Sequence, residues 1–145
     1  MATFNKVNDF VENYGEVMDV DGDTFIVALS NTAPASETNN PTTDTKGVLA
    51  NVTQIAYTNL SARTLTLSSS AQASGTYRVK FNDLVLTSTG GSTGPFRYIY
   101  IYDDTPTSPA DPLVCYYDYG SALTLANGES LTIDFDATNG LFSIA

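Results

Sequence analysis

The chain has 145 residues, 42% hydrophobic and 15% charged, with a formal net charge of -10, so we expect residues 1–145 to form one domain with its own core. Its six Lys and Arg residues are scattered, which argues against a surface that follows a nucleic-acid backbone. No run reaches the roughly 18 apolar residues that a spanning helix needs, so neither nucleic acid nor a membrane is an expected partner.

The N-terminal region carries the helical signal of this sequence. Apolar residues between Phe4 and Met18 recur at spacings of three and four, which is typical of an amphipathic helix. Turn-forming residues follow at Asp19–Asp23, so we expect residues 1–20 to form a short helix and a turn. Two uses of the apolar stripe stay open: internal packing, and an arm that contacts a partner. Residues Met1–Lys6 lack the features of a secretion signal, so export is not expected.

The remainder of the chain is rich in β-branched and aromatic runs, which are typical of strands. The predicted strands are Thr24–Ser30, Val52–Thr58, Arg63–Ser70, Tyr77–Thr87, Phe96–Tyr102, Leu113–Tyr117, Leu123–Leu125, Leu131–Phe135 and Leu141–Ile144. The pairs Asn127-Gly128 and Asn139-Gly140 predict tight hairpins, because Asn-Gly is favoured in type I′ turns. The predicted fold is an all-β, antiparallel β-sandwich of jelly-roll-like type with one short N-terminal amphipathic helix.

Three segments between the strands have the composition of loops. Asn31–Lys46 is polar and contains two prolines, and Thr105–Pro112 is punctuated by proline throughout. Gly90–Pro95 predicts a flexible turn before the strand at Phe96. The strand Phe96–Tyr102 is apolar on both faces, so we expect a second sheet on one face and a helix, a long loop or a neighbouring subunit on the other.

Few residues of this chain offer catalytic chemistry. Histidine is absent, which excludes a Ser-His-Asp triad, and no phosphate-binding glycine loop is present. The single cysteine, Cys115, lies among apolar residues, so a buried, inert thiol in a reducing cytoplasm is expected. We therefore predict a protein that is not an enzyme, with no catalytic, cofactor-binding or metal-binding residues and no cofactor. The remaining catalytic candidates are carboxylates, which we interpret mainly as solvated surface: Asp103, Asp104, Asp118, Glu129, Asp134 and Asp136.

The run Asp19–Asp23 begins like a calcium-binding loop, with oxygen ligands on alternate residues. The similarity then ends, because Thr24 and Ser30 occupy the positions where an EF-hand requires Gly and Glu. A turn rich in Asp and Gly is the preferred interpretation, and a weak structural cation site is the alternative.

Aromatic residues concentrate in Phe96–Tyr102 and at Tyr116, Tyr117 and Tyr119. Consecutive residues of a strand alternate between its faces, so at least half of these rings must point inward. Core packing and a subunit interface are the preferred interpretations, and a platform for carbohydrate is the alternative.

Three stretches of the sequence resemble small structural proteins from the morphogenesis regions of tailed bacteriophages: Ile26–Pro34, Gly47–Ile55 and Gly94–Pro112. The resemblance implies a virion structural protein, most plausibly a capsid decoration or cement protein that binds the assembled shell and stabilises it. Its implied partners are itself, as a homotrimer, and the major capsid protein. Its implied location is the capsid surface of a virion that is assembled in the bacterial host cytoplasm.

The alternatives to a cement protein are a tail, neck or head-fibre component, and a carbohydrate-binding module on the virion surface. The expected contact elements are the N-terminal helix and the two loops Asn31–Lys46 and Thr105–Pro112.

Overall fold

The computed structural model describes residues 2–34 and 47–145, and its strands pair antiparallel. The helices are α1 (Phe10–Glu16) and the 3-10 turn η1 (Leu49–Asn51). The strands are β1 (Thr3–Lys6), β2 (Phe25–Ser30), β3 (Leu67–Ala73), β4 (Thr76–Phe81), β5 (Leu84–Thr87), β6 (Thr93–Asp103), β7 (Leu113–Leu125), β8 (Ser130–Ile133) and β9 (Phe142–Ile144). The protein is therefore all-β with a short helix near its N-terminus, as its sequence predicts.

The centre of the molecule is a four-stranded sheet with the order β1-β7-β6-β2. Its two long strands, β6 and β7, pair so that Ile99 faces Tyr117 and Tyr100 faces Tyr116. Residues that face each other across a ladder share one side of the sheet. Both sides of β6 are buried, since Tyr100 and Ile101 are each 0% exposed.

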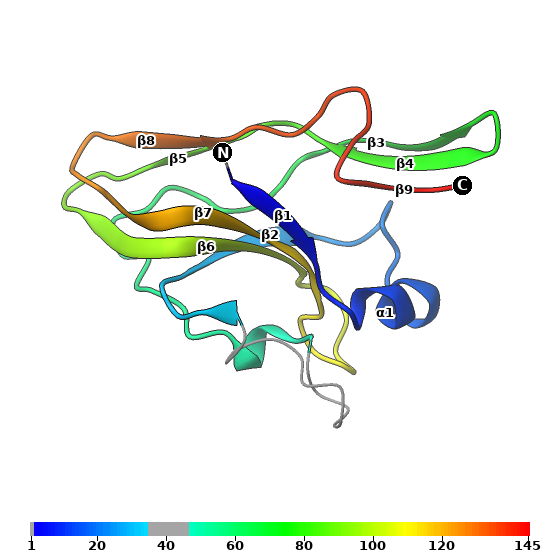
Figure 1. Ribbon diagram of the computed structural model, residues 1–145, viewed down its shortest axis with the longest axis horizontal. Coiled ribbons are helices and arrows are strands. Elements are labelled where there is room, and N and C mark those ends of the chain that lie inside the picture. The colour runs from blue at the N-terminus through cyan, green and yellow to red at the C-terminus, as the bar shows by residue number, and fades with distance from the viewer. Residues whose placement is uncertain (1, 35–46) are drawn as a thin grey trace.

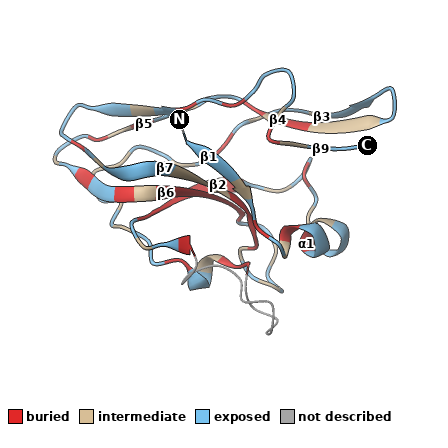
Figure 2. Cartoon of the chain, viewed as in Figure 1, coloured by how far each residue is buried: buried red, intermediate tan, exposed pale blue. Residues whose placement is uncertain are grey.

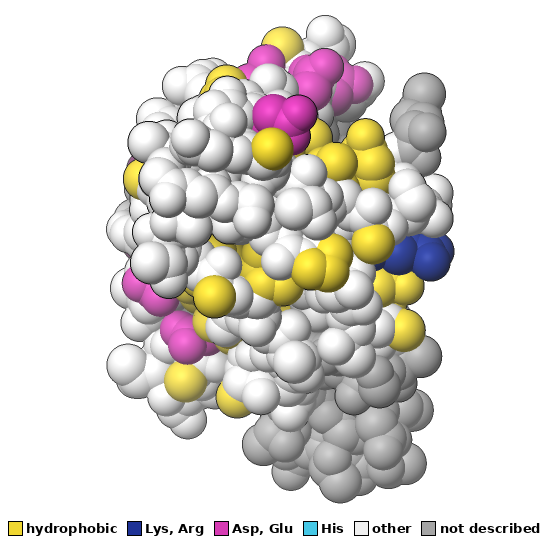
Figure 3. All heavy atoms as spheres, turned by 90° about the vertical axis from the view of Figure 1, so that its left-hand side faces the viewer, with side chains coloured by type: hydrophobic (Ala, Val, Ile, Leu, Met, Phe, Trp, Pro, Cys, Tyr) yellow, Lys and Arg dark blue, Asp and Glu magenta, His cyan; other side chains and the backbone are white. Residues whose placement is uncertain are grey.

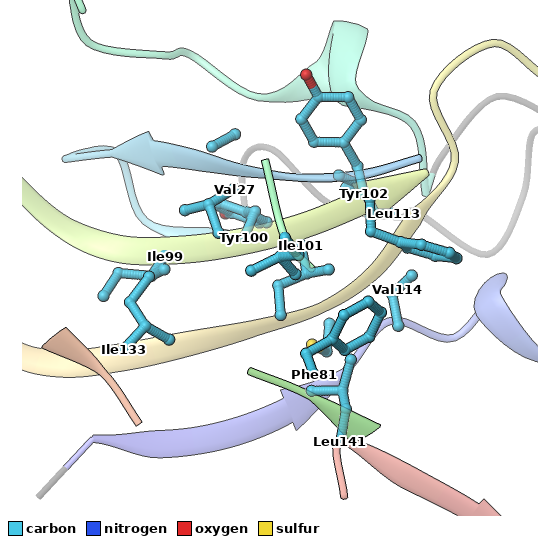
Figure 4. Close-up of a cluster of buried hydrophobic side chains, with 14 of the residues drawn as sticks. Val27, Phe81, Ile99, Tyr100, Ile101, Tyr102, Leu113, Val114, Ile133 and Leu141 are labelled. Atoms are coloured by element: carbon cyan, nitrogen blue, oxygen red, sulfur yellow. The ribbon is translucent and has the colours of Figure 1, made fainter. Parts of the chain in front are cut away.

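A second layer of strands covers one face of this sheet (Figure 1). It consists of the sheet β3-β4-β9 and the two-stranded ribbon β5-β8. The ring of Phe81 joins the layers, with its centroid 5.5 Å from that of Phe25 and 6.0 Å from that of Phe135. In Figure 4, Ile133 of the ribbon points toward Ile99 of the central sheet. One part of the hydrophobic core lies between these two layers.

The opposite face of the sheet is covered by irregular chain from residues 47–66, which includes η1 (Figure 1). Tyr98, Tyr100 and Tyr102 point to this side and are all buried. Figure 4 shows Tyr102 turned away from Phe81 and Leu141, which occupy the other side. The strand Phe96–Tyr102 is thus covered on both faces, by strands and by a long loop, as its two apolar faces predict.

The predicted helix Phe4–Met18 is wrong in its first part. Thr3–Lys6 form strand β1, which pairs with β7 in a register that places Phe4 opposite Tyr117. The helix begins only at Phe10, and its aromatic stripe packs on the C-terminal strand: the ring centroids of Phe10 and Tyr14 lie 4.9 and 5.6 Å from that of Phe142. The hydrogen bonds available at the edge of β7 outweigh the local helical periodicity of the first residues.

Several predicted strands differ from the observed ones. Residues 52–58 form no strand, and their pairing with the sheet is a bridge between Gln54 and Ser30. The run Arg63–Ser70 enters β3 only at Leu67, because its first residues lie along β2 instead. Tyr77–Thr87 divides into β4 and β5 around Asn82-Asp83, so its halves join different sheets. The runs Leu113–Tyr117 and Leu123–Leu125 are one strand, β7, and the turn expected at Gly90–Pro95 ends early because β6 starts at Thr93.

Both predicted Asn-Gly hairpins are wrong. Gly128 and Gly140 have positive φ angles of 88° and 80°, but a type I′ turn also needs a positive φ at the preceding residue, and neither Asn127 nor Asn139 has one. In addition, β8 pairs with β5 and β9 pairs with β4, so each turn carries the chain from one sheet to another. The strands on either side of each turn find their partners elsewhere in the sequence.

Candidate functional site

Strand β1 is an exposed edge of the central sheet. In the described part of the chain, it pairs with β7 on one side and with no strand on the other. Figure 2 shows β1 exposed, whereas β2 at the other end of the sheet is buried. An open edge presents unpaired backbone N–H and C=O groups to which another chain can add a strand. Two grooves flank this edge, one on each face of the sheet.

The first groove, named the apolar groove, lies between Ala2, which precedes β1, the strands β6 and β7, and β8, and has a volume of about 410 Å³. Its lining residues are Ala2, Ile99, Tyr117, Tyr119, Leu131, Thr132, Ile133 and Asp134. Phe4 stands beside it, with its ring centroid 5.5 Å from that of Tyr117. Phe4 is 45% exposed and Tyr119 is 40% exposed. Figure 3 shows hydrophobic side chains reaching the surface across one end of the molecule.

The second groove, named the tyrosine groove, lies on the other face and has a volume of about 330 Å³. Its lining residues are Thr3, Asn5, Ala33, Pro34, Tyr98, Tyr116 and Asp118. Asp118 is held by Arg97, whose Nε and Nη2 donate to the two carboxylate oxygens at 2.7 and 2.9 Å. The hydrogen bond from Arg97 lowers the pKa of Asp118, assisted by the N–H of Gly120. The groove therefore combines aromatic faces with fixed polar groups.

The opposite edge of the sheet, formed by β2, is closed by residues 54–64. The N–H groups of Ile55 and Val27 donate to the carbonyls of Leu29 and Arg63, both at 3.0 Å. The guanidinium of Arg63 donates to the carbonyl of Val27 and stacks over the ring of Tyr57 at 3.7 Å. The β2 edge is thus unavailable to another strand, and β1 is the open edge of this sheet among the described residues.

A buried and a half-buried carboxyl group join the α1–β2 turn to the end of β6. Asp103 is 0% exposed, and the carboxyl of Asp23 lies within hydrogen-bonding reach of it. Burial raises the pKa of Asp103 to about 7, with the added effect of the Asp23 carboxyl and against the lowering effects of the N–H and the hydroxyl of Thr105. The surface interpretation of Asp103 is wrong, because the period of two along β6 places it on the same side as buried Ile99 and Ile101. The contact of Asp103 with Asp23 could not be predicted from the sequence.

The other candidate carboxylates do not come together into one site. Asp104 is exposed beside Asp103, and Asp118 pairs with Arg97. Asp134 and Asp136 are exposed on either side of buried Phe135, in agreement with the surface interpretation. Asp136 caps a turn, because N–H groups of Asn139 and Thr138 donate to it and lower its pKa.

Glu129 and Asp83 also have structural partners. Glu129 accepts a hydrogen bond from the Ala126 N–H at 2.8 Å, and Asp83 accepts one from the Phe135 N–H at 2.9 Å. Asp83 shares a shallow pocket of about 370 Å³ with Lys80, Asp134 and Asp136. Glu129 and Asp83 therefore accept hydrogen bonds from backbone N–H groups and hold the local chain in place.

The run Asp19–Asp23 is a closed turn. The N–H of Asp19 donates to the Asp23 carboxylate, and the N–H of Asp23 donates back to the Asp19 carbonyl, both at 2.7 Å. Over residues 2–34 and 47–145, no group of three or more Asp, Glu or Cys side chains is arranged to hold a metal ion. Cys115 is buried, and burial raises the pKa of its thiol.

The structure describes two of the three expected contact elements. Helix α1 packs internally through Phe10 and Tyr14 but leaves Val11 exposed. The loop Thr105–Pro112 connects β6 to β7. It also pairs through Pro112 with Val48 of residues 47–66, here named the covering segment. Of the loop Asn31–Lys46, residues 35–46 lie outside the described residues. In the described part of the chain, no helix is long and apolar enough to cross a membrane.

Strand β1 was not predicted as a candidate site, because residues 1–20 were expected to form a helix and a turn, with the helical stripe starting at Phe4. The alternation Thr3-Phe4-Asn5-Lys6 is too short to be distinguished from one helical turn. No protein-family model matches this sequence, and the searches of curated proteins and of solved structures also gave no match. The site is therefore defined by geometry alone.

Proposed function

We propose that this chain is a structural protein of a tailed-phage virion, a capsid decoration or cement protein that binds the assembled shell through its β1 edge. The observation that carries the proposal is the open strand β1 with exposed Phe4 and Tyr119 beside the apolar groove. The sequence resemblance to phage structural proteins supplies the virion context. A non-enzymatic role agrees with the absence of histidine and with the structural partners of the carboxylates.

The chemistry of the edge suits an assembly contact. An added strand gains main-chain hydrogen bonds along β1, and the apolar groove receives alternate side chains of that strand. Thr3 and Asn5 point to one face and Phe4 to the other, so one strand of a partner reaches both grooves. Because the contact is short, its affinity for one subunit is modest, and repetition over a symmetric shell supplies the avidity.

A cement protein stabilises a shell by mass action, because it binds the assembled surface and not separate capsid subunits. The proposed partners are a second and third copy of this chain, as a homotrimer, and the major capsid protein. We also propose the finer fold assignment, a jelly-roll-like β-sandwich, which the two packed layers of strands support.

The test is binding to undecorated shells of the encoding phage, with the oligomeric state measured first by mass photometry. We expect trimers that bind on the order of hundreds of copies per shell and raise its disruption temperature. Phe4→Ser combined with Tyr119→Ser should abolish binding and leave the fold intact. The matched control is Ile144→Ser, which removes a side chain of similar exposure, 43%, from the edge strand β9 of another sheet.

Two results would contradict this proposal. If the protein is a monomer that does not bind shells, a tail, neck or head-fibre component becomes the expected role. Six or twelve copies per particle would then indicate a ring. Equal loss of binding for the β1 variant and the Ile144→Ser control would remove the β1 edge as the contact surface.

The tyrosine groove favours a second candidate function, carbohydrate binding on the virion surface. Tyr98 and Tyr116 supply aromatic faces, and Asn5 and Asp118 supply polar groups of the kind that fix sugar hydroxyls. A glycan array with the native protein and with Tyr116→Ala tests this candidate, because a specific sugar should be lost with the Tyr116 ring.

A further inference from the structure

The last residue of β6, Asp103, has an unusual environment for a carboxyl group. It is 0% exposed, and its Oδ1 accepts a hydrogen bond from the Thr105 N–H at 3.1 Å. Its Oδ2 has no hydrogen-bond partner among the residues that the structure describes. The side-chain groups within reach of the Asp103 carboxyl are the hydroxyl of Thr105 and the carboxyl of Asp23. Asp23 is half-buried. Two carboxylates that face each other out of bulk water repel, so one proton between them is needed to turn this contact into a hydrogen bond.

The two carboxyl groups cannot simply move apart, because hydrogen bonds fix them on both sides. The N–H of Asp19 holds the Asp23 carboxylate at 2.7 Å. The N–H of Thr24 donates to the Thr105 hydroxyl at 2.9 Å, and the N–H of Asp104 donates to the Thr24 carbonyl at 2.8 Å. The pair therefore sits inside a junction between the α1–β2 turn and the end of β6, here named the turn junction.

The surroundings of the turn junction disfavour a second negative charge. The turn contributes Asp19 and Asp21, and the loop after β6 contributes Asp104 and Asp111. The covering segment brings the cation Arg63 to Tyr102, the residue before Asp103, and Arg63 donates to the Val27 carbonyl and stacks on Tyr57. The groups around the pair are thus acidic, and the neighbouring cation is occupied.

A bound metal ion fits this environment less well than a proton. Calcium takes about six to eight oxygen ligands and usually some water. The pair offers two carboxyl groups, each with one oxygen already engaged by an N–H, and Asp103 has no exposed surface for water. No third acidic side chain among the described residues completes a metal site.

We propose that Asp23 and Asp103 share one proton that locks the turn junction, and that loss of this proton above neutral pH releases the α1–β2 turn from β6. Deprotonation transfers one proton to solvent and leaves two carboxylates facing each other. The pKa of Asp103, raised by burial to about 7, places this change near neutrality.

The sign of the pH dependence follows from linkage. The pKa of Asp103 in the folded protein lies above its ordinary value of 3.8. Its contribution to stability is therefore complete below the ordinary value and is lost as the pH rises through about 7. For one such group, the opening equilibrium of the junction should increase about tenfold between pH 6 and pH 8.

Amide hydrogen exchange at Thr24 and Asp104 measures the opening of the turn junction, after correction for the intrinsic effect of pH. In the native protein we expect about tenfold less protection at pH 8 than at pH 6. The Asp103→Asn variant keeps an acceptor for the Thr105 N–H and supplies a permanent donor to Asp23. Its protection at these amides should not change with pH. Asp23→Asn supplies the donor from the other side and should behave in the same way.

Glu16→Gln is the matched control, because it removes one negative charge from an exposed side chain outside the junction. It should keep the pH response of the native protein. If the native protein and Asp103→Asn respond to pH equally, the shared proton is excluded. If calcium chloride restores protection to the native protein at pH 8 and has no effect on Asp103→Asn, the carboxyl pair holds a cation and the proposal is overturned.

Discussion

The two edges of the central sheet, β2 and β1, are protected to very different extents. The β2 edge is covered by residues 54–64, which supply backbone hydrogen bonds, the Tyr57 hydroxyl and the Arg63 guanidinium. The β1 edge has no strand beyond it in the described residues, and Phe4 remains 45% exposed there. Natural sheets normally cover or interrupt their edges, so an open edge flanked by grooves points to a contact surface. The comparison predicts that changes at β2 reduce stability, whereas changes at β1 reduce binding.

The largest expected effect on stability is at the closed edge. Leu29 is 0% exposed on β2, so Leu29→Ala should lower the free energy of unfolding by about 2–5 kcal/mol through lost burial and the cavity left behind. Phe4→Ala on the open edge should cost about 1 kcal/mol, because its side chain is half exposed. Chemical denaturation of both variants measures the difference. Equal losses would mean that β1 is as much a part of the core as β2.

An intermediate effect is expected for the side chain that fastens the covering segment to β2. Arg63→Ala removes the hydrogen bond to the Val27 carbonyl and the stacking on Tyr57, and should cost about 1–3 kcal/mol. Arg63→Lys keeps the positive charge but loses the planar guanidinium, so its loss should lie between those of the native protein and Arg63→Ala. Thermal unfolding of the three proteins checks this order. A neutral Arg63→Ala would show that backbone hydrogen bonds alone close the edge.

The smallest expected effect is at the ion pair near the open edge. The hydrogen bond from Arg97 lowers the pKa of Asp118, so its contribution to stability is present above the ordinary pKa of 3.8 and is lost as the pH falls through the lowered value. Arg97→Gln should therefore lower the melting temperature slightly at pH 7 and not at pH 2. Both side chains are partly exposed, so added salt should reduce the effect. A difference that persists at pH 2 would assign the effect to packing.

Some residues were predictable because their signals are local. The alternation along Phe96–Tyr102 predicts burial on both faces, and β6 has that burial. The apolar spacing around Phe10 and Tyr14 predicts a helix with one buried stripe, and α1 packs both rings on Phe142. The surface positions of Asp134 and Asp136 also follow from alternation with Phe135. Each of these features depends on residues that are close together in the chain.

The features that define the candidate site depend on distant residues. The pair Asn139-Gly140 predicts a hairpin, yet the strands on either side of it, β8 and β9, pair with β5 and β4 and not with each other. Asp23 and Asp103 meet although 80 positions separate them, which no local pattern records.

By itself, the sequence determined the all-β class, the two-faced burial of β6 and the helical stripe of α1, because the periods of strands and helices are written in neighbouring residues. The tertiary structure decided that Thr3–Lys6 form an edge strand, that residues 54–64 close the opposite edge and that two carboxyl groups share a buried junction. Pairing and register depend on the free energy of contacts between segments far apart in the chain, and local periodicity contains no information about which segments meet.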